Sequence, residues 1–477
     1  MNSLKRMLML GLTVVMIFVS SMTVHAGETD FVIDNDGERL ATPKTYLVKD
    51  VITYLGEEGG NLYEPKDIFI DKEDKIYVAD TGNNRIVKLD PEGNYVRSYT
   101  GGGTLTGPQG VFVTDFGSVF VADTGNQRIA NIDEEDQILE TFVKPDSKLL
   151  DDSSDFSINK LCVSSQGILY VIKGQQFMTI DANNEFKGFV GANSLPFSLK
   201  RVLIRMFASE EQKSRLEMEE APPFNNFIIT DSGVIYAVAA TDSGKIKKLN
   251  ANDSNLFPEN YIAETIYDED GFREEPDYVD IAVDAQEIIS VLERNTGHIY
   301  QYDQDGNLLT IFGGKGNKKG YFQNPCSLAV NSRGEVYVLD TSTGYIHVFT
   351  STTFMEHIKS AINYYAGGEY TAAHEEWKAV IETDANYPVA NMGMGQTLYK
   401  MDEPKQAMKY FEIAKVQQRY GKAFEDYRYA FIKTYFTWVV LAAVAIVAAA
   451  GMFLFFIIKK TKKYIHDYHY GPEEMRE

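Results

Sequence analysis

The chain has 477 residues, 44% of them hydrophobic and 24% charged, so it is long enough to bury more than one hydrophobic core. Its formal net charge of −22 opposes the binding of nucleic acid or anionic lipid headgroups to the bulk of its surface. Two cysteines, Cys162 and Cys326, are too few for a disulfide-built scaffold.

The N-terminus has the pattern of a secretory signal. Lys5 and Arg6 precede an apolar run that is too short to cross a bilayer, and small residues follow it up to Ala26. This order of a basic, an apolar and a small-residue region predicts a cleaved signal peptide over residues 1–26. The run lacks the cysteine of a bacterial lipoprotein signal, so we expect no lipid anchor there.

Six related segments follow, and they can be aligned on one residue each. Every index residue is preceded, ten and eight positions earlier, by large apolar residues, a spacing typical of a buried strand with alternating faces. The index residues are Val78, Val121, Val171, Ala237, Val291 and Val338. Units of about 40–50 residues that hold several short strands are typical of propeller blades. The sequence therefore predicts an all-β six-bladed propeller over residues 45–350.

Two of the segments are near copies of each other. IYVADTGNNRI at 76–86 and VFVADTGNQRI at 119–129 resemble the NHL repeat, in which P-x-G-hydrophobic is followed by Y-V-A-D-T-x-N-x-R-I. The sixth segment keeps Asp340 and Thr341 but has Tyr345 in place of the arginine, and the third to fifth diverge. The resemblance covers roughly residues 45–350. It implies a six-bladed propeller and no particular chemistry.

The repeated phrase D-T-G-N is either a turn or a calcium loop. A calcium site needs more converging oxygen ligands than the phrase supplies. We favour a turn in which Asp80 ends one strand, Gly82 and its neighbouring asparagines tolerate positive φ, and Arg85 begins the next strand. Arg85 is expected to pair with the acidic surface.

The sixth segment is one strand short, because a helical pattern begins near Thr353. The unassigned stretch at 45–56, before the first repeat, has the composition of a strand. We expect it to complete the sixth blade, which would close the ring and remove an open edge.

Counting back eleven or twelve positions from each index residue predicts which side chains surround the mouth of the channel. The candidate ligand-binding residues are Lys66, Asp67, Gln109, Lys160, Asn226, Asp280 and Cys326. This mixed polar set favours binding a sugar or a peptide loop over catalysis, and we expect no metal and no cofactor. The alternative is a gluconolactonase-like or lyase-like metal-dependent enzyme acting at the channel mouth. Lys160 in the same ring would repel a divalent cation.

An insertion at 193–223 separates the third and fourth segments and contains an amphipathic helical pattern. Lys200, Arg201 and Arg205 form a basic patch on it. We favour a helix packed on its blade. A partner-docking or membrane-surface helix is the other interpretation, because long insertions in compact domains are often functional.

A helical region is expected over 353–435. Ala373 and Ala407 are 34 residues apart, as are Trp377 and Phe411, and the pattern resembles tetratricopeptide repeats. Such repeats bind proteins, but two of them could equally form a rigid spacer. We therefore expect either a protein-binding surface or a rigid spacer.

Residues 436–458 form an uncharged run of 23 residues, enough to span about 30 Å of hydrocarbon. The basic sequence KKTKK follows directly, which places the C-terminal tail, 459–477, in the cytoplasm. We therefore expect a single-pass type I protein of the plasma membrane, with propeller and helical stalk outside the cell.

Together these features predict a membrane-anchored, non-catalytic scaffold or capture module. Its partner would be a membrane or extracellular protein, a transport system among the candidates, or a small extracellular ligand.

Overall fold

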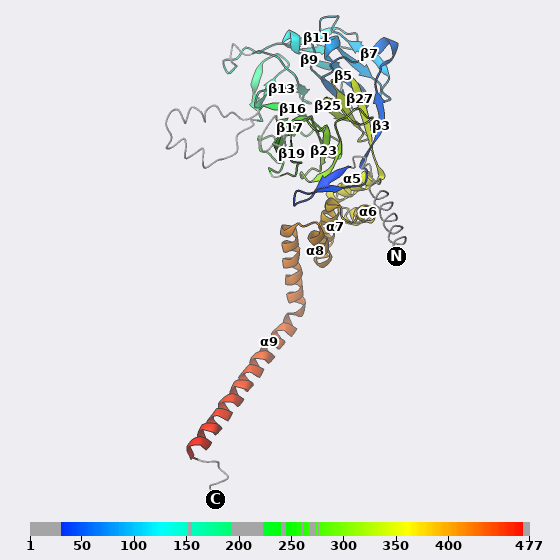
Figure 1. Ribbon diagram of the computed structural model, residues 1–477. Coiled ribbons are helices and arrows are strands. Elements are labelled where there is room, and N and C mark those ends of the chain that lie inside the picture. The colour runs from blue at the N-terminus through cyan, green and yellow to red at the C-terminus, as the bar shows by residue number, and fades with distance from the viewer. Residues whose placement is uncertain are drawn as a thin grey trace, which may run out of the picture. The chain divides into compact units, whose positions relative to one another are not determined.

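The computed structural model describes residues 30–150, 155–191, 223–239, 245–259, 261–267, 273–274 and 276–470 (Figure 1). The predicted signal peptide lies outside these residues, as do the basic candidates Lys200, Arg201 and Arg205 and nearly all of the insertion. Contacts divide the chain into two compact units, Met1–Ala390 and Asn391–Glu477. Each unit is described by itself.

The first unit contains the six-bladed propeller, and each predicted index residue lies on the second strand of its blade. Blades 1 and 2 consist of β4 (Asp67–Ile70), β5 (Ile76–Asp80), β6 (Arg85–Leu89) and β7 (Tyr95–Tyr99), then β8 (Gly110–Val113), β9 (Val119–Asp123), β10 (Arg128–Ile132) and β11 (Ile138–Phe142). Blades 3 and 4 consist of β12 (Leu161–Val163), β13 (Leu169–Lys173), β14 (Gln176–Ile180) and β15 (Phe186–Val190), then β16 (Phe224–Ile229), β17 (Ile235–Ala239) and β18 (Ile246–Leu249). A short hairpin, β19 (Ile266–Tyr267) and β20 (Arg273–Glu274), precedes blade 5.

Blades 5 and 6 complete the ring. Their strands are β21 (Tyr278–Val283), β22 (Ile289–Glu293), β23 (His298–Tyr302) and β24 (Leu308–Gly313), then β25 (Pro325–Val330), β26 (Val336–Asp340) and β27 (Tyr345–Ser351). The innermost strands contact one another between most neighbouring blades, and β25 of the last blade contacts β4 of the first; between blades 3 and 4 the contact with β16 is made by β13. The positions ten and eight before each index residue lie on the first strand of the blade, as Ile68 and Ile70 do on β4, whereas the second strands β5 and β9 are buried along their whole length.

The ring is closed as expected. Strand β3 (Tyr46–Ile52) pairs antiparallel with β27, with Tyr46 opposite Ser351 and Ile52 opposite Ile346 (Figure 1). The first strand of the propeller therefore forms the outer edge of the last blade. This arrangement ties residues about three hundred positions apart into one sheet and protects the edge of blade 6.

A second N-terminal element was not predicted. The hairpin β1 (Phe31–Ile33) and β2 (Arg39–Ala41) extends blade 5, because β1 pairs with β24 through Phe31 and Ile311. Asp30 is buried beside the hairpin, where its carboxylate accepts hydrogen bonds from the backbone N–H and the hydroxyl of Thr45, both at 2.7 Å. This hairpin therefore lies N-terminal to the predicted range 45–350 and extends one of its blades.

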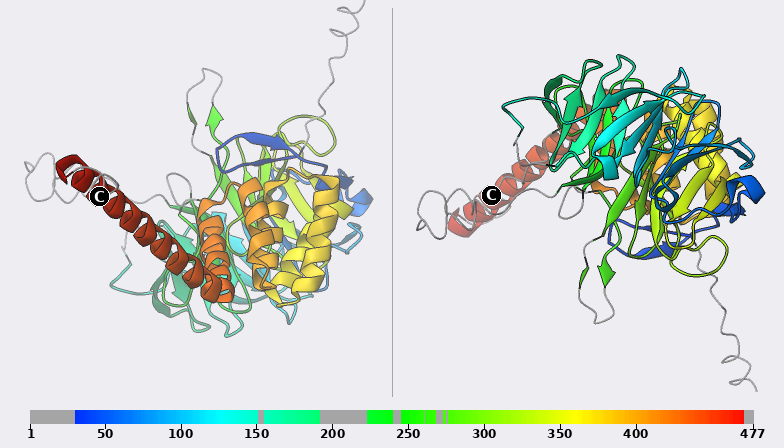
Figure 2. Two further views of the ribbon diagram at one scale, coloured as in Figure 1. Left: turned by 90° about the horizontal axis from the view of Figure 1, so that it is seen from below. Right: turned by 90° about the horizontal axis from the view of Figure 1, so that it is seen from above.

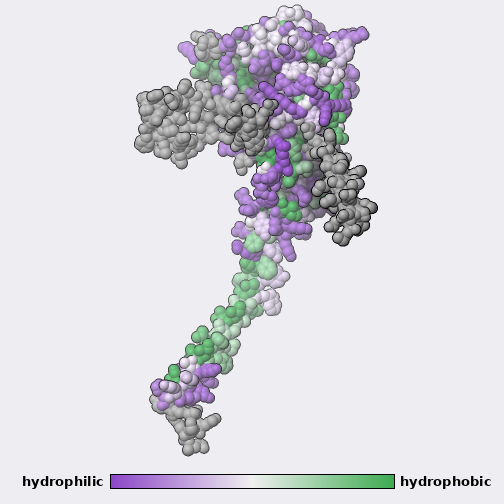
Figure 3. Space-filling model, viewed as in Figure 1, coloured by the Kyte–Doolittle hydropathy of each residue, from purple (hydrophilic) through white to green (hydrophobic). Residues whose placement is uncertain are grey.

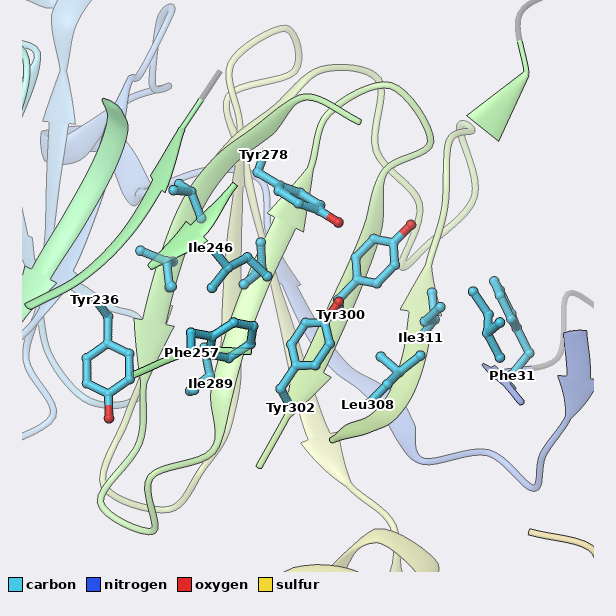
Figure 4. Close-up of a cluster of buried hydrophobic side chains, with 14 residues drawn as sticks. Phe31, Tyr236, Ile246, Phe257, Tyr278, Ile289, Tyr300, Tyr302, Leu308 and Ile311 are labelled. Atoms are coloured by element: carbon cyan, nitrogen blue, oxygen red, sulfur yellow. The ribbon is translucent and has the colours of Figure 1, made fainter. Parts of the chain in front are cut away.

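Aromatic side chains fill much of the space between blades 4 and 5. Tyr278, Tyr300 and Tyr302 are fully buried in one cluster, and the rings of Tyr278 and Tyr300 meet edge to face at 5.8 Å (Figure 4). Phe257 meets Tyr302 in the same manner at 5.6 Å. Large rings in offset contacts bury much apolar area, and they hold together two blades whose sequences have diverged from the repeat.

Acid is expected to destabilise blade 6 through His347 on β27. Its ring is 4% exposed, its Nδ1 atom has no hydrogen-bond partner among the described residues, and burial lowers its pKa to about 4. An unfolded histidine titrates near pH 6.5, so the unfolded state binds the proton first and stability is lost as the pH falls below 6.5. His347→Leu should therefore gain roughly 2 kcal/mol over wild type between pH 7.5 and pH 5. Urea unfolding of both proteins at the two pH values measures this; a constant difference would contradict the assignment.

Two helices complete the first unit. Helices α5 (Thr353–Ala366) and α6 (Tyr370–Thr383) lie side by side (Figure 2, left, yellow). From α5, Lys359 reaches into the propeller, where it is 4% exposed, 3.9 Å from the Asp284 carboxylate and over the ring of Tyr46. The Tyr387 hydroxyl donates to the carbonyl of Leu309. The helices that begin the predicted stalk are thus packed with the propeller.

Helix α7 (Pro388–Lys400) crosses the boundary, and α8 (Pro404–Ile413) and α9 (Gln417–Tyr470) belong to the second unit. The 34-residue spacing is reflected in burial, since Ala373 and Ala407 are both fully buried and Trp377 and Phe411 are both 3% exposed. A helical region of this spacing is therefore present. That it belongs to the tetratricopeptide class stays a prediction.

The predicted apolar segment 436–458 lies inside α9. Its large side chains are exposed, and Figure 3 shows the hydrophobic colouring along this part of the helix. By length and composition α9 could cross a membrane.

Candidate functional site

The channel entrance is formed where the innermost strands begin, and it brings together three of the predicted candidates. Asp67 of β4 accepts a hydrogen bond from the Lys160 ammonium at 2.7 Å, and the Ser327 Oγ atom lies 3.1 Å from the same carboxylate. The single proton of the Ser327 hydroxyl is donated to Asp280 of β21 at 2.5 Å. These groups come from four different blades, so the entrance is one buried polar network.

The carboxylates of this network are fully engaged. The second oxygen of Asp67 accepts from the backbone N–H of Val111 at 2.9 Å. Asp280 accepts from the N–H groups of Leu328 and Ile281, both at 2.8 Å. Asp67 and Asp280 are 2% and 1% exposed. Since every carboxylate oxygen already has a donor and an ammonium lies among them, the set does not fit a divalent cation, which requires free oxygen ligands.

Burial determines the charge state of the network. It raises the pKa of Asp280 to about 6, with Lys160 acting in the opposite direction. Burial alone would lower the pKa of Lys160, but Asp67 and Asp280 raise it above its ordinary value. The lysine is therefore a permanent cation at the centre of the ring, and Asp280 titrates just below neutral pH.

The remaining candidates lie around the network. Asn226 accepts a hydrogen bond from the N–H of Phe227, the next residue, at 2.7 Å, and Gln109 lies half-buried just before β8. The Cys326 thiol contacts the carbonyls of Pro65 and Leu339 at 3.4 Å, and burial raises its pKa. Below the network the channel holds a cavity of only about 60 Å³ with mainly apolar walls. Among the described residues, no group of three or more potential metal-ligating side chains comes together.

The repeated phrase forms a buried hub in each of the first two blades. Asp80 is fully buried; it accepts from the N–H of Tyr63 at 2.7 Å, from the Asn83 amide at 2.9 Å and from Arg85 Nε at 2.7 Å. The Arg85 guanidinium continues to the carbonyl of Gly59 at 2.6 Å. In blade 2 the carboxylate of Asp123 accepts the corresponding bonds from the N–H of Thr106, the Asn126 amide and Arg128 Nε.

These hubs confirm a turn but correct two details of its prediction. Thr81–Asn83 form a single 3₁₀ turn, and the positive φ of 56° belongs to Asn84. Gly82 is required for space, because a Cβ there would lie 2.7 Å from the carbonyl oxygen of Tyr63. Arg85 does not pair with an acidic surface; it neutralises the acid of its own turn.

Blade 6 keeps the acid and lacks the arginine, and a cleft lies beside it. Asp340 is fully buried and accepts four backbone N–H bonds, from Gln323, Asn324, Ser342 and Thr343, at 2.6 to 3.1 Å. The adjoining cleft, between blades 6 and 1, has a volume of about 780 Å³. It is lined by Thr53, Asn61, Leu62, Tyr63, Glu64, Lys66, Asn83, Asn324 and residues 341–345. Lys66 alone of the predicted candidates lines it.

A second hollow lies where the first strands of blades 2, 3 and 4 end, at the opposite end of the ring. It has a volume of about 540 Å³, and its walls include Phe112, Phe116, Phe120 and Phe142. The Phe116 side chain is 96% exposed at its rim. Neither hollow was predicted, because each is formed by turns of different blades.

The fold and the repeated hubs define a six-bladed β-propeller. Residues 62–89 match the NHL repeat family. No curated protein sequence matches the chain significantly.

Several solved structures are similar to the propeller. A virginiamycin B lyase from Staphylococcus aureus is 11% identical, with 67% of this chain and 87% of that one covered and a TM-score of 0.37. A gluconolactonase from Xanthomonas campestris is 10% identical, with 65% and 95% covered and a TM-score of 0.38. The WD40 propeller domain of Doa1 is also 10% identical, with 65% and 98% covered and a TM-score of 0.39.

Proposed function

We propose that this protein is a membrane-anchored, non-catalytic binding module whose propeller engages a protein partner or a small extracellular ligand. One observation carries the proposal: the polar groups at the channel entrance bond to each other and are buried. Asp67, Lys160 and Asp280 act as a clamp between blades. They offer no free acid, base or metal ligand, while accessible hollows lie elsewhere on the ring.

The membrane anchor in this proposal is the apolar part of α9. Lys459, Lys460, Lys462 and Lys463 follow the segment at once, and this bias favours a cytoplasmic C-terminus. The propeller would then face outward at the plasma membrane. A membrane protein, such as a component of a transport system, is a partner that an anchored propeller could reach.

Orientation is tested by labelling intact cells that express the chain with a membrane-impermeant amine reagent. The many lysines of the propeller should be labelled before lysis. Labelling of the propeller only after lysis would contradict the proposed topology.

Binding is tested by purifying the full chain from native membranes in mild detergent. The comparison is a chain with Tyr63→Ser, Tyr345→Ser and Phe116→Ser, which changes both hollows at side chains that are at least 38% exposed. We expect a stoichiometric partner or ligand that the triple variant loses and that Leu139→Ser, at an exposed position on β11, retains. If wild type, the triple variant and Leu139→Ser all retain the same partner or ligand, or if none of them retains any, a binding function of these faces is contradicted.

A further inference from the structure

The seam between blades 6 and 1 lacks bonds that close the neighbouring seams. Between blades 1 and 2, the Thr81 hydroxyl donates to the carbonyl of Pro108 at 2.6 Å, and Asn84 accepts from the N–H of Gly107 at 2.7 Å. Between blades 2 and 3, Thr124 donates to Ile158 at 2.6 Å. The corresponding residues of blade 6 are Thr341 and Gly344.

Within the described part of the chain, neither bond has a counterpart in blade 6. The carbonyl of Pro65, which corresponds to Pro108, is contacted by the Cys326 thiol instead. The Thr341 hydroxyl is buried and has no hydrogen-bond partner among the described residues. Gly344 has no side chain to replace that of Asn84. A buried hydroxyl without a partner is unfavourable, so the presence of Thr341 at the wall of a cleft indicates a site for a polar ligand atom.

Both walls of the cleft are held in place by buried acids. Asp80 fixes the backbone of Tyr63 on one side, and Asp340 fixes the backbones of Asn324 and Thr343 on the other. Side chains that project from a fixed backbone lose little conformational entropy when a ligand binds. The cleft is therefore preorganised, although it is open.

The lining specifies the chemistry of the ligand. The amides of Asn61 and Asn324 and the hydroxyls of Thr341, Ser342 and Thr343 provide both donors and acceptors, and Asn83 adds its amide oxygen, since its N–H groups already bond to Asp80 and to the Asn61 carbonyl. The only charged lining residues are one acid and one base, Glu64 and Lys66, so the cleft is neutral on a chain of net charge −22. Tyr63 and Tyr345 are 59% and 38% exposed and offer ring faces beside these polar groups.

We propose that this cleft is a binding site for a neutral carbohydrate, which rests on the binding function proposed above. A sugar carries hydroxyls that match alternating donors and acceptors, and its C–H faces pack on tyrosine rings. A charged ligand would find no net countercharge. The volume of about 780 Å³ lies in the range of about 300–1,000 Å³ that is usual for small-molecule sites.

The test is isothermal titration calorimetry on the full chain with maltotriose, chitotriose and xylotriose. The detergent must be of the polyoxyethylene type, since a glycosidic detergent would compete. We expect at least one trisaccharide to bind with an affinity that changes little between low and high NaCl, because the ligand is neutral. Tyr63→Ser and Tyr345→Ser should each weaken binding about tenfold or more, and Leu139→Ser should not.

Thr341→Val separates a ligand contact from a structural role. The hydroxyl makes no bond in the free protein, so its removal should leave the melting temperature unchanged or higher, and it should weaken trisaccharide binding several-fold. The assignment would be overturned if no trisaccharide binds, if binding is strongly salt-dependent, or if it survives all three cleft variants. A partner that co-purifies while no trisaccharide binds would leave the binding function standing and remove only its carbohydrate ligand.

Discussion

Lys160→Met is expected to destabilise the propeller by roughly 3–5 kcal/mol at neutral pH, the cost usual for removing one partner of a buried ion pair. The ammonium pairs with Asp67 at 2.7 Å and is also stabilised electrostatically by Asp280, and both carboxylates are almost completely buried. Methionine fills a similar volume but leaves two acids within one network without a cation. Because the network joins four blades, its loss should lower the stability of the whole ring.

The loss should be relieved by acid. Asp280 has a folded pKa of about 6 against about 3.9 in an unfolded chain, so the folded state binds the proton more tightly. This group's favourable contribution is complete below pH 4 and is lost as the pH rises through 6. Without Lys160 the folded pKa should rise further, so the deficit of the variant should shrink between pH 7.5 and pH 5.

Thermal and urea unfolding at the two pH values measure both effects. Lys72→Met is the matched control, because Lys72 also bridges two acids, Asp115 and Asp231, but on the surface. Exposed pairs contribute less than about 1 kcal/mol. Equal losses at the two lysines, or a Lys160→Met deficit that does not depend on pH, would show that the entrance network is not a buried clamp.

The convergence of Asp67, Lys160 and Asp280 could be predicted from the sequence, because counting from one index residue per blade places equivalent positions at the same height in the ring. The order of closure, with β3 completing blade 6, followed from one surplus and one missing strand. Aligning the blades on one index residue each does not show whether those side chains contact a ligand or one another. That depends on donors such as Ser327 and the N–H of Val111, which no motif marks.

Other features escaped the sequence for different physical reasons. The strands β1 and β2 have three residues each, too few for a periodic signal, and β1 pairs with a strand some 280 residues away. The cleft between blades 6 and 1 lies where blade 6 lacks two side chains of the repeat: Gly344 stands in the place of Asn84, and Tyr345 stands in the place of Arg85. Its one visible signal in the sequence is Tyr345 in place of the repeat's arginine.

The arginine that blade 6 replaces with Tyr345 is expected to be essential in blade 1, where it is Arg85. Arg85→Met should cost about 3 kcal/mol, because Asp80 is fully buried and the Arg85 guanidinium is the one cation that pairs with it among the residues that the structure describes. Asp80 receives one backbone N–H bond, from Tyr63, whereas Asp340 in blade 6 receives four. Blade 6 therefore tolerates a tyrosine where blade 1 requires an arginine.

A double-mutant cycle tests this dependence. If Arg85 acts by neutralising the acid, Asp80→Asn combined with Arg85→Met should cost clearly less than the sum of the single changes, since the amide needs no cation. Tyr345→Met, the same replacement at the equivalent position of blade 6, should change unfolding by less than about 1 kcal/mol. Additive losses at Asp80 and Arg85, or an equal loss at Tyr345, would mean that the arginine acts through packing alone. In that case the four backbone N–H bonds to Asp340 in blade 6 would not be a substitute for the Arg85 guanidinium that pairs with Asp80 in blade 1.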